Sequence, residues 1–107
     1  MRLYVIGPVS GFPENNRPAF EIAARQLHRA LGCAVEIPHD TVPSDADWQT
    51  AMRLSISAML RCDGVALLEG WRWSRGARIE RALAVELGIQ IGSVPWWEAT
   101  GGAAHGR

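Results

Sequence analysis

The run from Val65 to Glu80 constrains the fold of this chain more than any other stretch of its 107 residues. Four apolar residues begin at Val65, and the segment that follows them contains Gly70, Ser74 and Gly76. After this segment comes a helical pattern with Glu80 on its apolar side. A strand that passes directly into a helix is typical of an open α/β sheet, in which ligands bind at such junctions. A helix N-terminus with Ser and Gly favours an anion, so the run predicts an anion site with a carboxylate one turn behind it.

The rest of the chain repeats this alternation of strands and helices. Continuous apolar runs predict strands, apolar residues at helical spacing predict helices, and Gly or Pro ends most of these segments. The expected strands span residues 3–6, 34–37, 64–68 and 89–94, and the expected helices span residues 17–31, 48–61 and 75–87. This order predicts an α/β fold of three layers, in which a four- to five-stranded parallel sheet is covered by helices on both faces.

We expect one domain over residues 1–95 and a C-terminal tail over residues 96–107 that is partly disordered. The last seven residues are small and rich in Gly. Trp96 and Trp97 have two open interpretations, packing on the edge of the sheet or contact with a partner.

Charge and hydropathy exclude several classes of function. The formal net charge is zero, which argues against binding of duplex nucleic acid. All eleven basic residues are Arg, so chemistry that needs a Lys is excluded. No apolar run approaches the ~20 residues of a membrane span, so we expect no membrane partner.

Cysteine usage bears on the compartment and on metal binding. Cys33 and Cys62 stand outside any CxxC motif, which indicates free, buried thiols in a reducing, cytoplasmic environment. No group of His, Cys and Asp has the spacing of metal ligands, and the GxGxxG motif is absent. We therefore expect neither a metal nor a cofactor.

Glu80 is the candidate catalytic residue. Its neighbours on the helix face are small or apolar: Gly76, Ala77, Leu83, Ala84 and Leu87. The carboxylate is therefore expected to face inward, where burial is expensive unless the group is paired or functional and where its pKa tends to rise. The alternative is a solvated Glu, or one bonded to a helix end or to an Arg. Ser74 also has two interpretations, an ordinary N-cap or a ligand for an anion.

The loop after the first strand belongs to the same predicted site. In a parallel sheet this loop and the loop after the third strand share the carboxyl edge. Ser10 and Gly11 are therefore expected to face Ser74 and Gly76 across one cleft.

Further polar and aromatic residues are expected around this cleft. His39 and Asp40 follow the second strand and are candidates for a polar wall. Trp71 is a candidate for stacking on a base, whereas packing or a dimer contact is the preferred interpretation of Trp73.

Two helix surfaces remain to be explained. An Arg recurs at every third position from residue 72 to residue 81: Arg72, Arg75, Arg78 and Arg81. These residues form a solvated helix face paired with Glu residues, or one of them contacts a phosphate.

The helix over residues 47–61 is apolar on more than one side and needs two partners. We expect the sheet to be one of them and the same helix of a second subunit to be the other, which predicts a homodimer.

Four stretches of the sequence resemble the nucleoside 2-deoxyribosyltransferase-like superfamily, in particular its small, mostly uncharacterised bacterial and phage branch. They are LYVIGPVSG at residues 3–11, NRPAF at 16–20, CDGVALLEGW at 62–71 and SRGARIE at 74–80. The resemblance covers about residues 2 to 95. It implies a flavodoxin- or Rossmann-like sheet, assembly into dimers or larger oligomers, and cleavage of the N-glycosidic bond of a nucleoside or nucleoside 5′-monophosphate.

The resemblance also implies roles for individual residues. Glu80 attacks the anomeric carbon and forms a glycosyl-enzyme, which water resolves in a hydrolase and a second base resolves in a transferase. The loops that hold the 5′-phosphate correspond to Ser10, Gly11, Ser74 and Gly76. The whole expected substrate-binding set is Tyr4, Gly7, Ser10, Gly11, His39, Asp40, Ser55, Trp71, Ser74 and Gly76.

Ser55 departs from the pattern of the superfamily. Its members usually carry an Asp eight residues before the position of Asp63, and that Asp protonates the leaving base or binds the sugar. A serine cannot act as a carboxylic acid, and loss of such a group commonly costs ~10²–10⁴ in rate. Either His39 or Asp40 replaces it, or the leaving group needs little help, or the chain binds a nucleotide without efficient turnover. The sequence thus leaves an N-glycosidase or 2-deoxyribosyltransferase and a nucleotide-sequestering protein as hypotheses, with a protein-interaction scaffold as a third.

Overall fold

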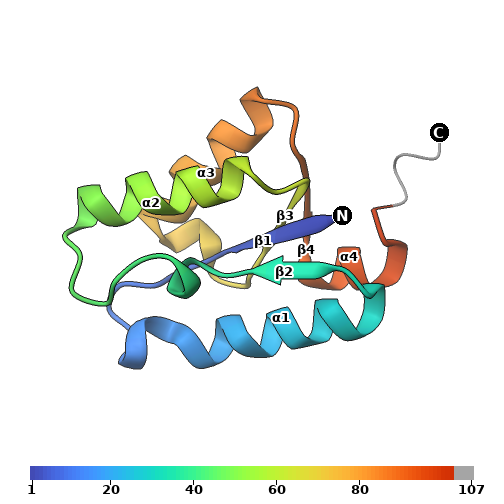
Figure 1. The fold of residues 1–107 in the computed structure, drawn as a ribbon, viewed down its shortest axis with the longest axis horizontal. Helices are drawn as coiled ribbons and strands as arrows, with labels where there is room; N and C mark the ends of the chain where they lie inside the picture. The colour runs from blue at the N-terminus through green and yellow to red at the C-terminus, as the bar shows by residue number, and fades with distance from the viewer. Residues whose placement is uncertain (103–107) are drawn as a thin grey trace.

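Four short strands form one parallel sheet. They are β1 (Arg2–Ile6), β2 (Ala34–Glu36), β3 (Gly64–Leu67) and β4 (Gln90–Ser93), in the spatial order β2-β1-β3-β4. Every neighbouring pair is parallel, as the continuous apolar runs predict. The computed structural model that shows this arrangement describes residues 1–102 (Figure 1).

Helices cover both faces of the sheet and complete the three predicted layers. Figure 1 shows α2 (Trp48–Leu60) and α3 (Arg75–Glu86) on one face, and α1 (Arg17–Leu31) and α4 (Val94–Thr100) on the other. Three short 3₁₀ segments lie in the connections: η1 (Pro13–Asn16), η2 (Pro38–Asp40) and η3 (Trp71–Trp73). The expected three-layer Rossmann- or flavodoxin-like fold is confirmed, with four strands.

The alternation of side chains along β1 divides the core into two halves. Leu3 and Val5 pack in a cluster with residues of α1 and α4, whereas Tyr4 and Ile6 pack in a cluster with residues of α2 and α3. All four side chains are buried. Successive side chains of a strand point to opposite faces, so a strand buried on both faces reads as an unbroken apolar run.

The segment after β4 is a helix, which the sequence analysis missed. The Ser93 hydroxyl caps α4 by accepting a hydrogen bond from the backbone N–H of Trp96. Trp97 is fully buried, and its indole N–H donates to the Val65 carbonyl oxygen at 2.8 Å. The expected domain boundary at residue 95 therefore falls inside α4, and the expected tail is helical as far as Thr100. Residues 103–107 of that tail lie outside the described part of the chain.

The order of the strands places a crevice at the carboxyl ends of β1 and β3. The chain leaves β1 for α1 on one face and leaves β3 for α3 on the other, so the two connections diverge at this point. Ligands of open α/β sheets bind in such a crevice. The loops that follow β1 and β3, residues 7–12 and 68–74, are those that carry the predicted site.

Two expectations from composition can be compared with the fold. Cys33 and Cys62 are both free and buried, as predicted. Within residues 1–102, no helix has the length and hydropathy to cross a lipid bilayer.

Candidate active site

Glu80 lies on the buried face of α3. Ala77 and Ala84, on the same face, are buried as well, and the Glu80 side chain is 6 % exposed. The helix begins at Ser74, whose hydroxyl accepts a hydrogen bond from the backbone N–H of Ala77 at 3.3 Å. The inward orientation predicted for Glu80 is therefore correct, and the N-cap interpretation of Ser74 is realised.

A chain of two buried hydroxyl groups leads to the Glu80 carboxylate. Ser55 Oγ donates to Glu80 Oε2 at 2.5 Å, and Tyr4 Oη lies 2.6 Å from Ser55 Oγ. When Glu80 is ionised, Ser55 gives its single hydroxyl proton to the carboxylate, so Tyr4 is the donor to Ser55. Both hydrogen bonds thus point toward the carboxylate and stabilise its ionised form.

Burial and this hydrogen bond act in opposite directions on the titration of Glu80. Burial raises the pKa of Glu80 from 4.5 to about 7, and the hydrogen bond from Ser55 opposes that rise. Burial also raises the pKa of the Tyr4 phenol well above its ordinary value, so Tyr4 keeps its proton at neutral pH. Near pH 7, Glu80 is therefore present in both protonation states, which is typical of a catalytic carboxyl group.

The carboxylate faces a cavity of about 530 Å³ at the carboxyl edge of the sheet. This Glu80 cavity is enclosed by the loop after β1, by η1 and η2, and by the first turns of α2 and α3. It has the size of a small-molecule site. The predicted site residues in its wall are Gly7, Ser10, His39, Ser55, Ser74, Gly76 and Glu80. Ser10 and Ser74 thus share one cleft, as expected.

Gly76 sits where α3 begins and where α2 approaches it. A Cβ at this position would lie 2.9 Å from Met52 Sδ, near the flexible end of that side chain, so a larger residue would force Met52 to move within the cavity wall. The first backbone N–H groups of a helix have no partner within it. Ala77 is satisfied by the cap, and within residues 1–102 the N–H groups of Arg75 and Gly76 have no hydrogen-bond partner, so they are available to an anion.

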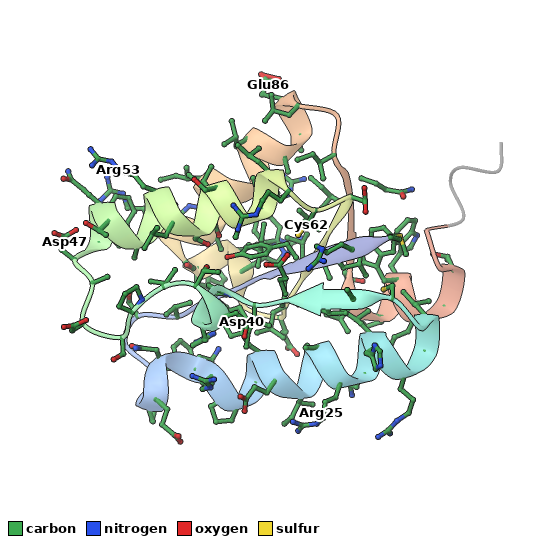
Figure 2. All side chains as sticks on the ribbon, viewed as in Figure 1. Arg25, Asp40, Asp47, Arg53, Cys62 and Glu86 are labelled. Carbon is green, nitrogen blue, oxygen red and sulfur yellow. The ribbon has the colours of Figure 1, made fainter. Side chains whose placement is uncertain are left out.

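Four predicted site residues lie outside the wall of this cavity. The Asp40 carboxylate (Figure 2) accepts a hydrogen bond from the Ile37 N–H at 3.1 Å and so closes the turn η2. Trp71 packs beneath Arg81, whose guanidinium carbon lies 4.9 Å from the ring centroid. Gly11 is exposed in a turn with φ of 86°. Tyr4 is fully buried and is connected to the cavity only through Ser55.

A left-handed turn that the sequence analysis missed supplies further wall residues. Glu14, Asn15 and Asn16 have φ of 55°, 53° and 61°, a region that costs non-Gly residues about 1–2 kcal/mol each. His39 Nε2–H donates to the Asn15 carbonyl oxygen, and Asn16 Nδ2 donates to the Pro8 carbonyl oxygen, both at 2.8 Å. Asn16 therefore anchors the turn instead of capping α1 with its side chain.

This turn places Glu14 and Asn15 in the wall of the Glu80 cavity. Glu14 is therefore a second carboxyl group at the site. The available signal was the pair of Asn residues after a Gly- and Pro-rich loop, because Asn tolerates the left-handed region.

The Arg residues of α3 and its preceding loop are not paired with Glu residues. Among the described residues the ion pairs are Arg2–Glu36 and Arg17–Glu21. Arg75 lies 4.1 Å over the Trp48 ring, and Arg78 donates to the carbonyl oxygen of Arg72. Arg75 lies at the start of α3, beside the first free N–H groups of that helix.

Fold and site together define an α/β protein with a buried carboxylate in a ligand-sized cavity at the topological switch point. The chain belongs to the family described as a domain of unknown function (DUF4406), whose model matches residues 1–93. No curated protein matches the chain. Since this family has no assigned function, the resemblance to the nucleoside 2-deoxyribosyltransferase-like superfamily stays a prediction.

Proposed function

We propose that the chain is a nucleoside or nucleoside 5′-monophosphate N-glycosidase or 2-deoxyribosyltransferase, with Glu80 as its nucleophile. The observation that supports this proposal most is the buried Glu80 carboxylate in the wall of a 530 Å³ cavity, held by Ser55 beside the start of α3. The cavity has room for a sugar and a base, and the free N–H groups of Arg75 and Gly76 suit a 5′-phosphate.

The reaction follows from a carboxylate placed against an anomeric carbon. Ionised Glu80 attacks that carbon, the bond to the base breaks, and the base leaves with the electron pair. Water or a second base then attacks the same carbon, and Glu80 is released as a carboxylate. The hydrogen bond from Ser55 orients the attacking group and keeps part of it ionised at neutral pH.

Protonation of the leaving base falls to a group other than Ser55. Of the two residues considered as replacements, His39 lies in the cavity wall and Asp40 does not. His39 Nε2 is engaged with Asn15, and its buried Nδ1 has no hydrogen-bond partner among the described residues. Glu14 is a further carboxyl group in the same wall. We propose that the proton comes from His39 Nδ1, when both ring nitrogens carry a proton, or from the protonated carboxyl group of Glu14.

The test is release of free base from a panel of ribo- and deoxyribonucleosides and their 5′-monophosphates. We expect Glu80→Gln to abolish release and the intact mass of the wild-type chain, after acid quench, to include a pentosyl adduct. The matched control is Glu86→Gln, because Glu86 lies on the same helix, exposed at its far end (Figure 2). Equal release by the wild type and Glu80→Gln would refute the proposal.

A nucleotide-binding protein without turnover is the second candidate. It is favoured by Ser55, which occupies the place of a carboxylic acid and bonds directly to Glu80. This candidate predicts calorimetric binding of a nucleotide that survives Glu80→Gln, with no base released. If Ser55→Asp releases base roughly 10²-fold faster than the wild type, which is what a general acid contributes, the chain is an enzyme that has lost its acid.

We also propose a homodimer through α2, in a cytoplasmic protein. Leu54 and Leu60 on α2 and Ile79 on α3 are exposed apolar side chains of this layer. Their exposure agrees with a helix that is apolar on more than one side and needs a second partner. The buried free thiols of Cys33 and Cys62 agree with a reducing compartment.

A further inference from the structure

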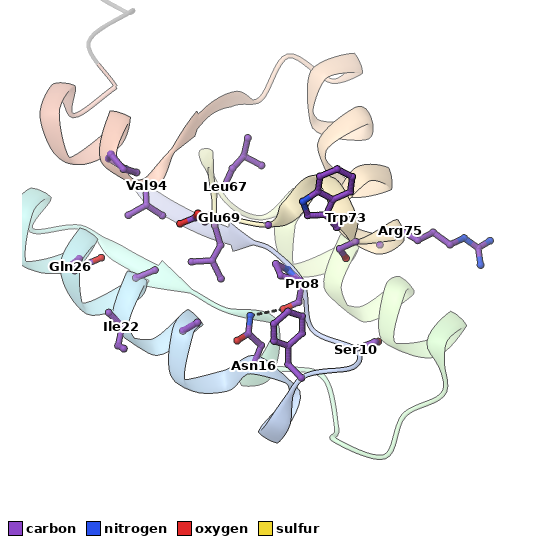
Figure 3. A pocket seen from close by; sticks show the side chains of 18 of the residues that line it. Pro8, Ser10, Asn16, Ile22, Gln26, Leu67, Glu69, Trp73, Arg75 and Val94 are labelled. Atoms are coloured by element: carbon purple, nitrogen blue, oxygen red, sulfur yellow. Dashed lines mark hydrogen bonds between the residues drawn. The ribbon is translucent and has the colours of Figure 1, made fainter.

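A second and larger cavity adjoins the Glu80 cavity. It has a volume of about 900 Å³, and its wall includes residues of α1 and α4 and of the loop that follows β3 (Figure 3). The two cavities share Ser10, Trp48, Ser74 and Gly76. They therefore meet at the start of α3, where the free N–H groups lie, and Glu80 belongs only to the smaller one.

The chemistry of the larger cavity differs from that of the shared residues. Its wall contains the carboxylates of Glu69 and Glu98 and the amides of Asn16 and Gln26. Among the described residues, the one basic residue of this wall is Arg75, which lies at the shared end and stacks on Trp48. Away from that end, the cavity offers hydrogen-bond acceptors and negative charge, which suit hydroxyl and amino donors and disfavour a second anion.

The larger cavity also presents aromatic surface. Trp73 is 87 % exposed at its rim, and Phe12, at 47 %, lines it as well. Figure 3 shows Trp73 on one side of the cavity and Ile22 and Gln26 of α1 on the other. An exposed indole beside acceptor groups is suited to stacking on a nucleic-acid base, which tolerates any base because each has a π-face.

We propose that the larger cavity binds a second nucleoside, so that the ligand of this chain is a dinucleoside diphosphate. Its phosphate bridge lies at the start of α3, one nucleoside lies in the Glu80 cavity, and the other lies between Trp73 and the carboxylates of Glu69 and Glu98. The assignment of the first nucleoside rests on the proposed function. The assignment of the second rests on the larger cavity alone.

The experiment compares binding of dinucleoside diphosphates and the matching nucleoside 5′-monophosphates of adenine, guanine, cytosine and uracil by calorimetry. Stacking of one base on an aromatic side chain strengthens binding by about tenfold or more. We expect at least one dinucleoside diphosphate to bind about tenfold more tightly than its monophosphate. Trp73→Ala and Glu98→Gln should remove this gain and leave monophosphate affinity unchanged. Leu87→Ala is the control, because Leu87 is exposed and lines neither cavity.

The outcomes separate this inference from the proposed function. Equal affinities for both ligand types, or an equal loss of both in Trp73→Ala, would overturn the second subsite. A change of molecular mass in Trp73→Ala without a change in binding would assign Trp73 to a contact between chains and would also overturn it. A preference for the larger ligand without release of base would support the subsite and refute the glycosidase. Release of base from monophosphates without such a preference would support the glycosidase and refute the subsite.

Discussion

Glu80 is an ionisable side chain in the core, so its charge affects the stability of the fold as well as the chemistry of the site. It is the only buried charged side chain within residues 1–102. A carboxyl group in such a place is easier to keep protonated than ionised, which is why its pKa is raised to about 7. The Ser55 and Tyr4 hydroxyls reduce that cost but do not remove it.

Glu80→Gln should make the stability of the fold less dependent on pH. Below pH 4.5 the folded and unfolded chains both hold this proton. Between pH 4.5 and 7 the unfolded chain releases it while the folded chain retains it, so stability falls as pH rises, by about 3 kcal/mol in all. Denaturant unfolding at pH 4.5 and pH 8 should show this fall in the wild type and in Glu86→Gln, but not in Glu80→Gln. The same fall in all three proteins would show that Glu80 titrates normally.

Ser55→Ala should move the titration of Glu80 to higher pH. A hydrogen bond to a charged group contributes about 1.5–3 kcal/mol, which corresponds to about one to two pH units. Tyr4→Phe should cause a smaller shift in the same direction, because Tyr4 acts through Ser55. The readout is the pH dependence of the ¹³C chemical shift of the Glu80 carboxyl carbon, which requires no activity. An unchanged midpoint in Ser55→Ala would exclude the hydroxyl chain as the group that stabilises the carboxylate.

At the scale of elements, α4 is held against the sheet by Trp rings that fit over glycines. A Cβ at Gly92 would lie 2.1 Å from Trp96 Cε3, and a Cβ at Gly64 would lie 2.7 Å from Trp97 Cη2. Gly92 lies in β4 and Gly64 in β3, so the two strands share the contact with α4. Glycine in a strand often marks such a close approach.

Gly92→Ala should destabilise the fold because the new methyl group overlaps the Trp96 ring. Overpacking of this kind typically costs about 1–3 kcal/mol. All three atoms nearest to the added Cβ belong to Trp96, so Trp96→Ala should relieve the overlap. The free energies of unfolding of the two single variants and the double variant form a double-mutant cycle, in which we expect a strong favourable coupling. Additive effects would show that α4 does not pack on Gly92.

At the scale of the whole molecule, the layer of α2 and α3 differs from the layer of α1 and α4. Five exposed large apolar residues lie on α2 and α3, whereas Ile22 is the one such residue on α1. The five are Trp48, Leu54, Leu60, Ile79 and Val85. A dimer contact through this layer would leave both cavities accessible, because they open at the carboxyl edge of the sheet.

The dimer prediction is tested by the molecular mass in solution. Light scattering should give about twice the 11.7 kDa of one chain. Leu60→Arg should give the mass of one chain, because a buried, unpaired charge opposes association. Ile22→Arg, which places the same charge on α1, should leave the dimer intact. A single-chain mass for the wild type at working concentration would contradict the prediction.

Local patterns of the sequence were sufficient for most of the elements and for the orientation of Glu80. Helical spacing of small and apolar residues around Glu80 predicts its inward face, and the parallel direction of the strands predicts that Ser10 and Ser74 share a cleft. The missed helix α4 had a signal of its own, a Ser three residues before a Trp pair with a Pro in the first turn. A Pro after an apolar run is also typical of the end of a strand, and this second interpretation predicts no helix at residues 94–100.

The sequence by itself thus determined the order of the strands and of the first three helices, the layers of the fold and the position of the buried carboxylate. These follow from periodicity and capping, which act over a few residues. Only the tertiary structure decided what the carboxylate contacts, since Tyr4, Ser55 and Glu80 are separated by 51 and 25 residues. It also placed Trp71 under Arg81 and left Trp73 exposed. Such contacts depend on how whole helices pack across the sheet, and no local spacing encodes them.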